Sequence, residues 1–503
     1  MSKTKPDKSA LILTATILAS GLGFFMGSAV NVVLPTIQGY WDLDLSLVQW
    51  IANSYALTLS AFILVSGSLG DFFGVRRVFN IGILVFTVAG ALCGFAPTPG
   101  LLILGRAVQG LGAAFMVPGS LAIINRLYPE GERGRVIGLW AGVSGAIAAL
   151  GPFLGGILAD LSWRWVFWMI VPIGVAASVV TTLAVPKLRN EGEKGVDFAG
   201  AAAVLLALGG LSFGLIRIPE VGLTWLTGSG LALAALSGVV FFPIERRAGH
   251  PIVPFGMFNR TVAVANVSTL LLYFSFQGAF FLLSFVFQQL LGYSASFTGL
   301  AFLPTTAMIA LLSAPSGSVT DRRGPRLQLV LGPAIVAVGL FVMAFGIRQP
   351  GYLSFWLPAT LVFGAGMVFL IPAITKAALT VPEHFSGAAS GLNNAAARTA
   401  GLLAITILGA LLSATYQLLL PGALPADLSE AAREAVLADA GKLLAAELPS
   451  AVPEGLRSAV EEARRDAFAA GGRVAIGVSA ILASLAALLA LLRFPKAGSA
   501  GAR

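Results

Sequence analysis

The chain has 503 residues, of which 57% are hydrophobic and only 11% are Asp, Glu, Lys or Arg. A soluble globular protein carries roughly 25% charged residues, so this composition excludes a water-soluble enzyme, a disordered protein and a nucleic-acid-binding protein as the main interpretation. A single cysteine, Cys93, excludes an intrachain disulfide, and with only two histidines we expect no metal site. The composition therefore predicts an integral membrane protein.

Apolar segments long enough to cross a bilayer recur along the whole chain. A spanning helix needs about 20 predominantly apolar residues, and these runs lack the period-two alternation of membrane β-strands. The first run, from Leu11 to Pro35, is too long for the apolar core of a signal peptide. Breaks at charges and at Gly/Pro clusters give fourteen predicted spans: 10–34, 48–69, 78–97, 101–125, 136–159, 165–185, 198–217, 226–244, 262–290, 297–319, 327–347, 353–380, 387–416 and 473–493.

The basic residues sort to one side of these spans. If the N-terminus is inside, the two termini and the cytoplasmic loops hold most of the 32 Lys and Arg, whereas the short opposite loops hold Arg164, Arg217 and Arg348. The positive-inside rule then predicts a multi-pass protein of the cytoplasmic membrane with both termini in the cytoplasm. The net charge of +9 is thus a topology signal, and no nucleic-acid partner is predicted.

The loop at 417–472, between the last two spans, carries charges of both signs. Asp427 and Glu430 have the spacing of a capping box, and apolar residues recur at helical spacing around 436–444 and 456–467. We expect two short amphipathic helices lying on the outer surface. This external loop is either a tether, or a lid or docking site for an envelope partner.

The sequence also repeats over a long range. The stretch Gly67–Arg76 (G-S-L-G-D-F-F-G-V-R) matches Gly317–Arg326 (G-S-V-T-D-R-R-G-P-R), and further matches follow at nearly the same offset near Gly110 and Pro129. Spans two, four and five then correspond to spans ten, twelve and thirteen, which makes spans seven and eight an inserted pair. An even shift predicts a parallel repeat with a binding site between the halves near the midplane. The expected domains are 1–190, the inserted pair 191–250 and 251–503.

These motifs resemble the major facilitator superfamily, in its fourteen-helix drug:proton antiporter branch. The resemblance rests chiefly on G-S-L-G-D-F-F-G-V-R-R at 67–77, L-x-x-x-R-x-x-Q-G at 102–110 and L-G-P-F-L-G-G at 150–156. It implies an all-α integral membrane fold of two six-helix halves plus two inserted helices. It also implies a secondary transporter, not an enzyme, that exports hydrophobic or amphipathic small molecules by alternating access with proton coupling and without a cofactor.

Several motif residues are candidates for gating. Asp71 could cap the next helix or pair with Arg76 or Arg77. Glycines of the fifth span, including Gly142 and Gly145, should allow close helix approach, while the proline of its motif frees a backbone carbonyl and favours a kink. The full gating set is Gly67, Asp71, Gly74, Arg76, Arg77, Arg106, Gln109, Gly110, Gly151, Pro152, Gly155, Gly156, Asp321 and Arg322.

The chain departs from its family pattern in its charges. The first span has Met26 where related antiporters carry an Asp, and every acid falls in a tail, a loop or a span end. Three basic residues lie within spans instead. Arg106 could bind backbone carbonyls that lock helices together, Lys376 could extend to the membrane surface, and Arg398 is the best candidate for substrate contact. A further departure is Ile147, where the helix-five motif usually has Gly.

These charges favour an anionic-headed amphipath over a cationic drug. The candidate cavity residues are Arg398, Asn394, Gln277, Tyr273, Asn31 and Met26. The open alternatives are a lipid or glycolipid exporter, and a facilitator that lacks the usual carboxylate coupling. The expected partners are a small hydrophobic or amphipathic substrate and the lipid bilayer, and we expect a monomer.

Overall fold

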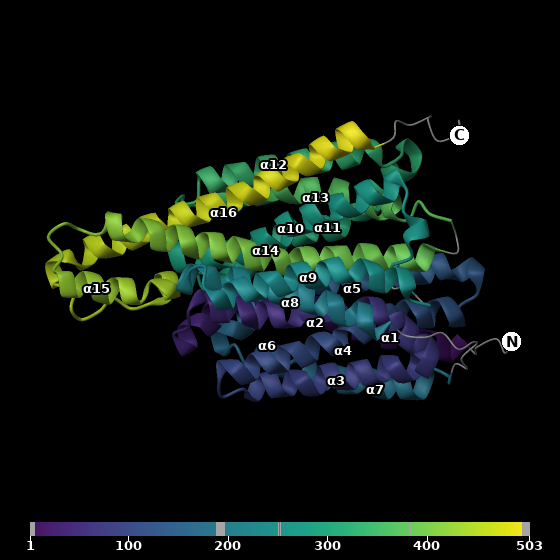
Figure 1. The fold of residues 1–503 in the computed structure, drawn as a ribbon. Coiled ribbons are helices and arrows are strands. Elements are labelled where there is room, and N and C mark those ends of the chain that lie inside the picture. Colours follow the sequence, from purple (N-terminus) through teal and green to yellow (C-terminus); the bar gives the residue numbers. More distant parts are fainter. Residues whose placement is uncertain (1–5, 188–196, 250, 252, 383–384, 495–503) are drawn as a thin grey trace.

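The computed structural model describes residues 6–187, 197–249, 251, 253–382 and 385–494. Across these residues the chain forms long helices and no strand, and the helices run side by side in one elongated bundle (Figure 1). Thirteen of them are long and apolar enough to cross a membrane. The 29-residue helix α2 (Leu45–Phe73) packs among them against α4 and α14, and it completes the fourteen predicted spans. The predicted all-α membrane fold is confirmed.

The N-terminal group of helices and the inserted pair account for the first half of the chain. The group comprises α1 (Pro6–Trp41), α2, α3 (Val75–Phe95), α4 (Pro99–Leu127), α5 (Glu130–Leu161), α6 (Trp165–Trp168) and α7 (Ile170–Ala184). The inserted pair is α8 (Phe198–Val221) and α9 (Trp225–Arg247).

The C-terminal group contains both long helices and short irregular turns. Its long helices are α10 (Arg260–Phe285), α11 (Ala295–Arg323), α12 (Arg326–Phe345), α13 (Leu357–Ala378), α14 (Ser386–Ala423) and α16 (Arg457–Arg493). Its short elements are η1 (Phe255–Met257), the π-helical turns η2 (Val286–Leu290) and η3 (Tyr352–Trp356), then α15 (Glu430–Ala438), η5 (Ala440–Ala445) and η6 (Glu454–Leu456).

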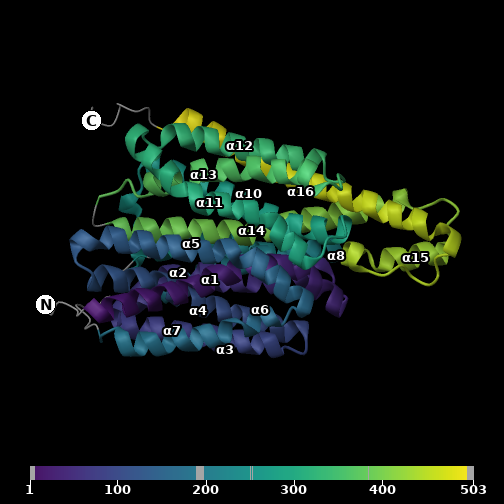
Figure 2. The same cartoon turned by 180° about the vertical axis from the view of Figure 1, so that it is seen from behind.

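The two ends of the bundle differ, and we name them for what they carry. The terminal end holds the start of α1 and the end of α16, whereas the loop end holds α15 (Figure 1). Seen from behind, α3 and α7 still lie at one edge and α12 at the other, with α5 and α14 between them (Figure 2). The inserted pair joins this arrangement because α8 packs on α9 and also on α2 and α14.

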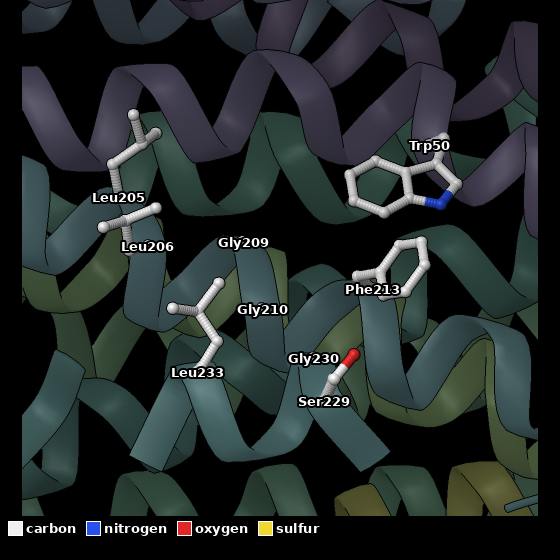
Figure 3. A pocket seen from close by; sticks show the side chains of 9 residues that line it. All are labelled: Trp50, Leu205, Leu206, Gly209, Gly210, Phe213, Ser229, Gly230 and Leu233. Atoms are coloured by element: carbon white, nitrogen blue, oxygen red, sulfur yellow. The ribbon is translucent and has the colours of Figure 1, made fainter. Parts of the chain in front are cut away.

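The inserted pair leaves an apolar groove against α2. The groove has a volume of about 400 Å³, with Trp50 and Phe213 at one end and Leu205 and Leu206 at the other (Figure 3). Its one hydroxyl, on Ser229, already donates to the Leu226 carbonyl at 2.8 Å. Much of α9 is exposed, as a helix that faces lipid should be.

The sequence repeat reappears in the backbone. Gly74 ends α2 and Gly324 ends α11, and both have a positive φ, of 94° and 76° respectively. Residues with a side chain rarely adopt this conformation. The two matched glycines therefore make the same tight reversal at the terminal end, once in each group of helices.

The predicted loop at 417–472 is partly wrong. The cap of α15 is Ser429, whose hydroxyl accepts from the Ala432 amide at 3.3 Å, and not Asp427. The second expected helix is the first part of α16, which runs unbroken for 37 residues. A helix of that length measures about 55 Å at 1.5 Å per residue, which exceeds a hydrocarbon core of about 30 Å. The segment therefore projects from the bundle with α15, and does not lie flat on its surface (Figure 1).

The paired reversals make a stability prediction. Replacement of Gly74 or Gly324 by Ala should lower the free energy of unfolding by about 1–3 kcal/mol, because Ala is strained at this backbone geometry. Gly67→Ala is the control, since Gly67 lies inside α2 and nothing comes within 4 Å of its Cβ position. Apparent melting temperatures in detergent should fall for the first two variants and not for the third. An equal fall for all three would contradict this account.

Candidate functional site

The loop-end half of α5 is packed tightly between α1 and α11. A Cβ atom on Gly156 would collide with the Ala295 backbone of α11, and one on Gly299 would collide with the Pro152 backbone of α5. Two further motif glycines pack in the same way on α1: Gly151 and Gly155. Close helix approach at this motif is therefore confirmed, and it joins the N-terminal group to the C-terminal group.

The backbone carbonyl that Pro152 frees has found a donor. Proline at position 152 removes the amide that would bind the Ala148 carbonyl, and the Ser28 hydroxyl of α1 donates to that carbonyl at 2.8 Å. The next carbonyl, of Ala149, accepts from the Thr306 hydroxyl of α11 at 3.0 Å. Two neighbouring carbonyls near Pro152 thus accept from side chains, Ala148 from its own group of helices and Ala149 from the other group.

Asp160 caps a helix of the opposite group. Its carboxylate accepts from the amides of Ala295 and Ser296, at 3.2 and 3.1 Å, while Ser294 accepts from the Phe297 amide at 3.1 Å. The first amides of a helix have no partner within the helix, and negative charge is favourable there. The last turn of α5 therefore completes the first turn of α11.

A second contact joins α2 to α14. The Gln49 amide donates to the Ile405 and Thr406 carbonyls at 2.6 and 3.1 Å, and Asn53 donates to the Thr406 hydroxyl at 3.0 Å. Gln49, Asn53 and Thr406 are all buried. Since a buried amide without a partner is costly, these bonds favour the joined arrangement.

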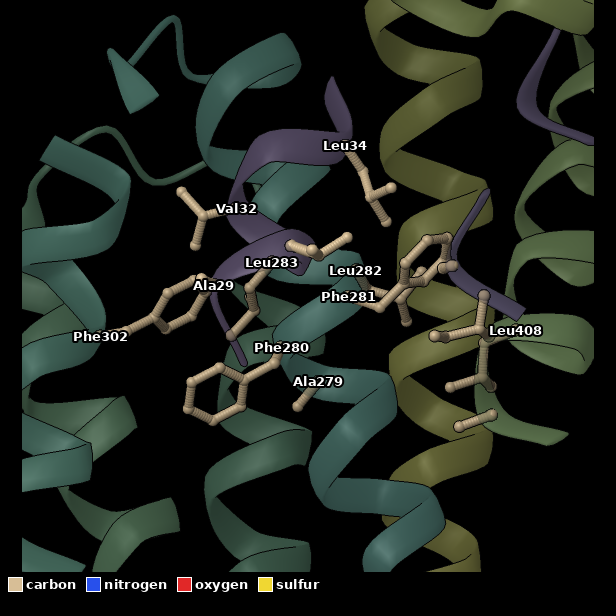
Figure 4. Packing of buried hydrophobic residues seen from close by; sticks show 14 of the residues in the cluster. Ala29, Val32, Leu34, Ala279, Phe280, Phe281, Leu282, Leu283, Phe302 and Leu408 are labelled. Carbon is tan, nitrogen blue, oxygen red and sulfur yellow. The ribbon is translucent and has the colours of Figure 1, made fainter. Parts of the chain in front are cut away.

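A third contact joins α1 to α10 and η2. Gln288 donates to the Val32 carbonyl at 2.7 Å and accepts from the Thr36 hydroxyl at 3.4 Å. Around these polar groups the helices pack through apolar side chains, with Ala29, Val32 and Leu34 of α1 beside residues 279–283 of α10 (Figure 4).

The projecting segment, which comprises α15, η5, η6 and the first part of α16, docks on the loop end of the bundle. The Gln38 amide of α1 donates to the Lys442 carbonyl of η5 at 3.1 Å. The Lys442 ammonium binds both Asp42 and Asp439, and hydrogen bonds from it to these two carboxylates hold the pKa of Lys442 above its usual value. Burial raises the pKa of the neighbouring Asp44 carboxyl. Thus η5 ties the turn between α1 and α2 to the C-terminal group.

The projecting segment also contains a buried cation. Arg464 of α16 donates to the Leu443 and Ala446 carbonyls at 2.9 and 2.7 Å and approaches the Tyr416 hydroxyl at 3.4 Å. Leu443 has a positive φ of 58°, so its backbone is strained. The carbonyl bonds from Arg464 hold η5 in the shape that fits over α1 and α2.

At the terminal end, α5 and α11 are not packed together. Three glycines of α5 have no neighbouring atom within 4 Å of their Cβ positions: Gly138, Gly142 and Gly145. Leu139 of α5 and Leu311 of α11 are 52% and 74% exposed. The expectation that Gly142 and Gly145 allow close approach is thus wrong in this conformation. Within the described chain, α5 and α11 therefore pack together toward the loop end and are apart toward the terminal end.

Arg106 is a structural brace. It is buried, its Nε donates to the Ile51 carbonyl at 3.3 Å, and its Nη1 donates to the Gln109 side chain at 2.6 Å. Its guanidinium also lies 4.3 Å from the centroid of the Tyr55 ring. The carbonyl-binding alternative for Arg106 is confirmed. Gly110 supports the same contact, because a Cβ atom there would collide with the backbone of α2.

The terminal-end motif residues are only partly engaged. Arg76 donates to the Thr182 carbonyl at 2.7 Å, whereas Arg77 is exposed. Gly74 occupies the N-cap position of α3 (Val75–Phe95), and the predicted cap by Asp71 stays a prediction. The pairing of Asp71 with Arg76 or Arg77 involves a side chain that lies outside the described part of the structure.

The corresponding motif of the second group is engaged through an ion pair. Asp321 binds the Lys376 ammonium at 2.7 Å, so Lys376 is held by a partner as well as reaching toward the surface. Both side chains line a pocket of about 410 Å³ between α11 and α13. Arg322 is exposed.

The predicted cavity residues divide by burial. Arg398, Asn394, Gln277 and Tyr273 are half-buried on the facing helices α14 and α10, where Gln277 packs against Gly401. Asn31 is buried, and Met26 is wholly buried in the apolar core. Met26 therefore does not line an open space in this conformation.

The neutral polar residues that join the two groups are absent from the sites that the sequence predicts. Their shared signal is an amide or hydroxyl inside an otherwise apolar span, and the residues are Gln38, Gln49, Asn53, Thr306 and Thr406. Ser28 carries the same signal but joins α1 to α5 within one group. Arg464 and Lys442 are also absent from the predicted sites, because the sequence of a loop does not indicate which helices the loop will contact.

The chain is similar to known transporters. The sequence model described as Major Facilitator Superfamily matches residues 16–405. The tetracenomycin C resistance and export protein of Streptomyces glaucescens is 31% identical over 490 residues, which are 95% of this chain and 90% of that protein. The multidrug resistance protein Stp of Mycobacterium tuberculosis is 32% identical over 410 residues, 79% of this chain and 76% of that protein. The puromycin resistance protein of Streptomyces alboniger is 34% identical over 409 residues, 79% of this chain and 80% of that protein.

Solved structures show the same fold. A bacterial homologue of the human lysosomal transporter Spinster matches with a TM-score of 0.69 at 16% identity, covering 97% of both chains. The xylose transporter XylE from E. coli matches with a TM-score of 0.58 at 14% identity, covering 98% of both chains.

The carbonyl freed by Pro152 makes a prediction about coupling. Ser28→Ala should cost about 1 kcal/mol, because it leaves the Ala148 carbonyl without its donor. In a Pro152→Ala background the restored amide can bind that carbonyl, so the same change should cost much less. A thermal-stability double-mutant cycle in detergent should give a coupling energy of about 0.6–1 kcal/mol.

The control for this cycle is Ser284→Ala. The Ser284 hydroxyl bonds only within its own helix, to the Phe280 carbonyl at 2.7 Å, and its effect should add to that of Pro152→Ala. Strict additivity for Ser28 and Pro152 as well would show that the freed carbonyl does not depend on this hydroxyl.

Proposed function

The chain belongs to the major facilitator superfamily, and on that premise we propose that it exports hydrophobic or amphipathic small molecules across the cytoplasmic membrane by alternating access. Relatives named for resistance to antibiotics, or for their export, support this proposal. It is a transporter and not an enzyme.

The observation that carries the mechanism is the one-sided closure of the bundle. Contacts between α5 and α11, α2 and α14, and α1 and α10 lie toward the loop end, while α5 and α11 are separate toward the terminal end. A carrier that alternates between two open states needs its two groups of helices to meet at one end at a time. The bonds described above would break when the loop end opens.

The sidedness of the bundle follows from charge. Arg76, Arg77, Arg322 and Arg323 lie at the terminal end, together with other basic residues of its loops. By the positive-inside rule, we place the terminal end, with both termini, in the cytoplasm. The open end then faces the cytoplasm, where an exporter must collect its substrate.

Proton coupling is the part of the proposal that rests on family resemblance alone. The acids of the central helices occupy only their terminal turns, as Asp160 and Asp321 do, so coupling would use groups at the helix ends. A lipid or glycolipid exporter is the alternative, and a facilitator without the usual carboxylate is another. In a lipid or glycolipid exporter the projecting segment would bind an envelope partner. For all three functions we propose a monomer.

A reversible cross-link tests alternating access. Cysteines replacing Asp160 and Ser296, whose carboxylate and amide lie 3.1 Å apart, should form a link that holds the loop end shut. Efflux from proteoliposomes should then fall at least tenfold and return when the link is reduced. The native Cys93 is buried and should not interfere.

The control link joins the turn after α12 to α16 within one group, through cysteines replacing Arg348 and Asp466, which form an ion pair at the same end. This link should leave efflux within about twofold of the reduced protein. Continued efflux with the first link closed would rule out alternating access between the two groups.

A further inference from the structure

Arg398, which is half-buried, differs from the other cations within the helices of the bundle. Arg106 and Arg464 direct their guanidinium groups at backbone carbonyls, and Lys376 pairs with Asp321. Within the described part of the chain, the guanidinium of Arg398 makes no hydrogen bond and no ion pair. A charge held inside a membrane protein without a partner is costly, and this one braces no helix.

The position of Arg398 is central in the bundle. It lies in α14 and its guanidinium carbon is 5.4 Å from the ring centroid of Phe24, which is midway along α1. One of its Nη atoms lies 3.9 Å from the Cβ position of Gly27. Arg398 therefore reaches from the C-terminal group to the N-terminal group near the midplane. It lies between the loop-end contacts and the terminal end.

The surroundings of Arg398 are aromatic and neutral. The Phe24 ring meets Trp140 edge-on at 6.4 Å, and Tyr273 meets Phe276 edge-on at the same distance. Tyr273 lies on α10, which packs against α14, the helix that carries Arg398. Asn394 lies one turn away and uses its amide on the Ser390 carbonyl at 3.2 Å, which leaves its side-chain oxygen free to accept.

No carboxylate of the neighbouring helices can neutralise this charge. The acids of α1, α2, α5 and α11 lie in the first or last turns of those helices, and α10 and α14 contain none. A counter-charge near the midplane must therefore come from outside the protein. The rigid fork of a guanidinium suits a planar or tetrahedral oxyanion.

We propose that Arg398 binds the anionic group of an aromatic amphipath, such as a carboxylate, phenolate or sulfonate, while Phe24, Trp140 and Tyr273 contact the rings of that molecule. This assignment rests on the proposed export function and gives its substrate class. The substrate enters from the open terminal end, and its charge is neutralised by Arg398 on the way across.

Two matched fluorescent probes test the proposal. The compound 8-anilinonaphthalene-1-sulfonate carries a sulfonate, and N-phenyl-1-naphthylamine has the same rings without it. Binding of each is measured to the full chain in nanodiscs, with empty nanodiscs subtracted. Arg398→Met should weaken binding of the sulfonate about tenfold, which is about 1.4 kcal/mol, and change binding of the neutral probe by less than twofold. Arg398→Lys should recover part of the loss, because it keeps the charge without the fork.

The control is Arg247→Met, which removes an exposed cation from the end of α9 and should leave both probes unaffected. Retained binding of the neutral probe shows that Arg398→Met is folded. The proposal is overturned if Arg398→Met leaves the sulfonate unaffected, or if it weakens both probes equally.

Efflux of the same probes from proteoliposomes separates this inference from the proposed function. Efflux of the neutral probe, with neither binding nor efflux of the sulfonate, would overturn the anion site and leave the exporter intact. Arg398-dependent binding of the sulfonate without efflux of either probe would support the site and count against export.

Discussion

The structure depends on one constraint, which is that backbone and charged groups within a bilayer must find their partners inside the protein. At the loop end the two groups of helices supply these partners to each other. Asp160 satisfies the first amides of α11, and Thr306 donates to the Ala149 carbonyl near Pro152. Each such bond has a modest net value of about 1 kcal/mol. The interface can therefore be specific in its pairing and still open during transport.

The same constraint governs the charged residues inside the spans, which are basic, whereas the acids lie in loops or at span ends. Arg106 is tolerated because the Ile51 carbonyl and the Tyr55 ring lie beside it, and Arg464 because two backbone carbonyls accept from it. Arg106 holds α4 to α2, and Arg464 shapes the segment that covers the loop end. Arg398 has the Phe24 ring beside it, but among the described residues no carbonyl or carboxylate binds its guanidinium, so the protein offsets only part of its cost. A cation that braces no helix is in this way available to meet a substrate.

Much of the fold could be predicted because it depends on local pattern. Hydrophobic length gave the spans, and the repeat predicted that Gly74 and Gly324 would occupy equivalent turns. Close helix packing at 151–156 could also be predicted, because small residues allow close helix approach wherever they lie on a helix. The unbroken start of α16 could not be read from the sequence, because an amphipathic stretch looks alike whether it lies on a membrane or extends a span. Nor could the docking of Lys442 on Asp42, which joins residues 400 positions apart. The absence of a neighbouring helix at Gly142 is a property of this conformation, and a sequence does not specify which conformation is adopted.

The central claim is that closure at one end of the bundle opposes closure at the other. Spin labels at Gly138 and Leu311 report on the terminal end, and labels at Phe95 and Phe345 report on the loop end. All four positions are exposed. Distances measured by pulsed electron paramagnetic resonance in nanodiscs are compared with and without the change Asp160→Ala, which removes the cap on α11. The account predicts shorter distances at the terminal end together with longer distances at the loop end. A change at one end alone, or changes of the same sign at both ends, would contradict it.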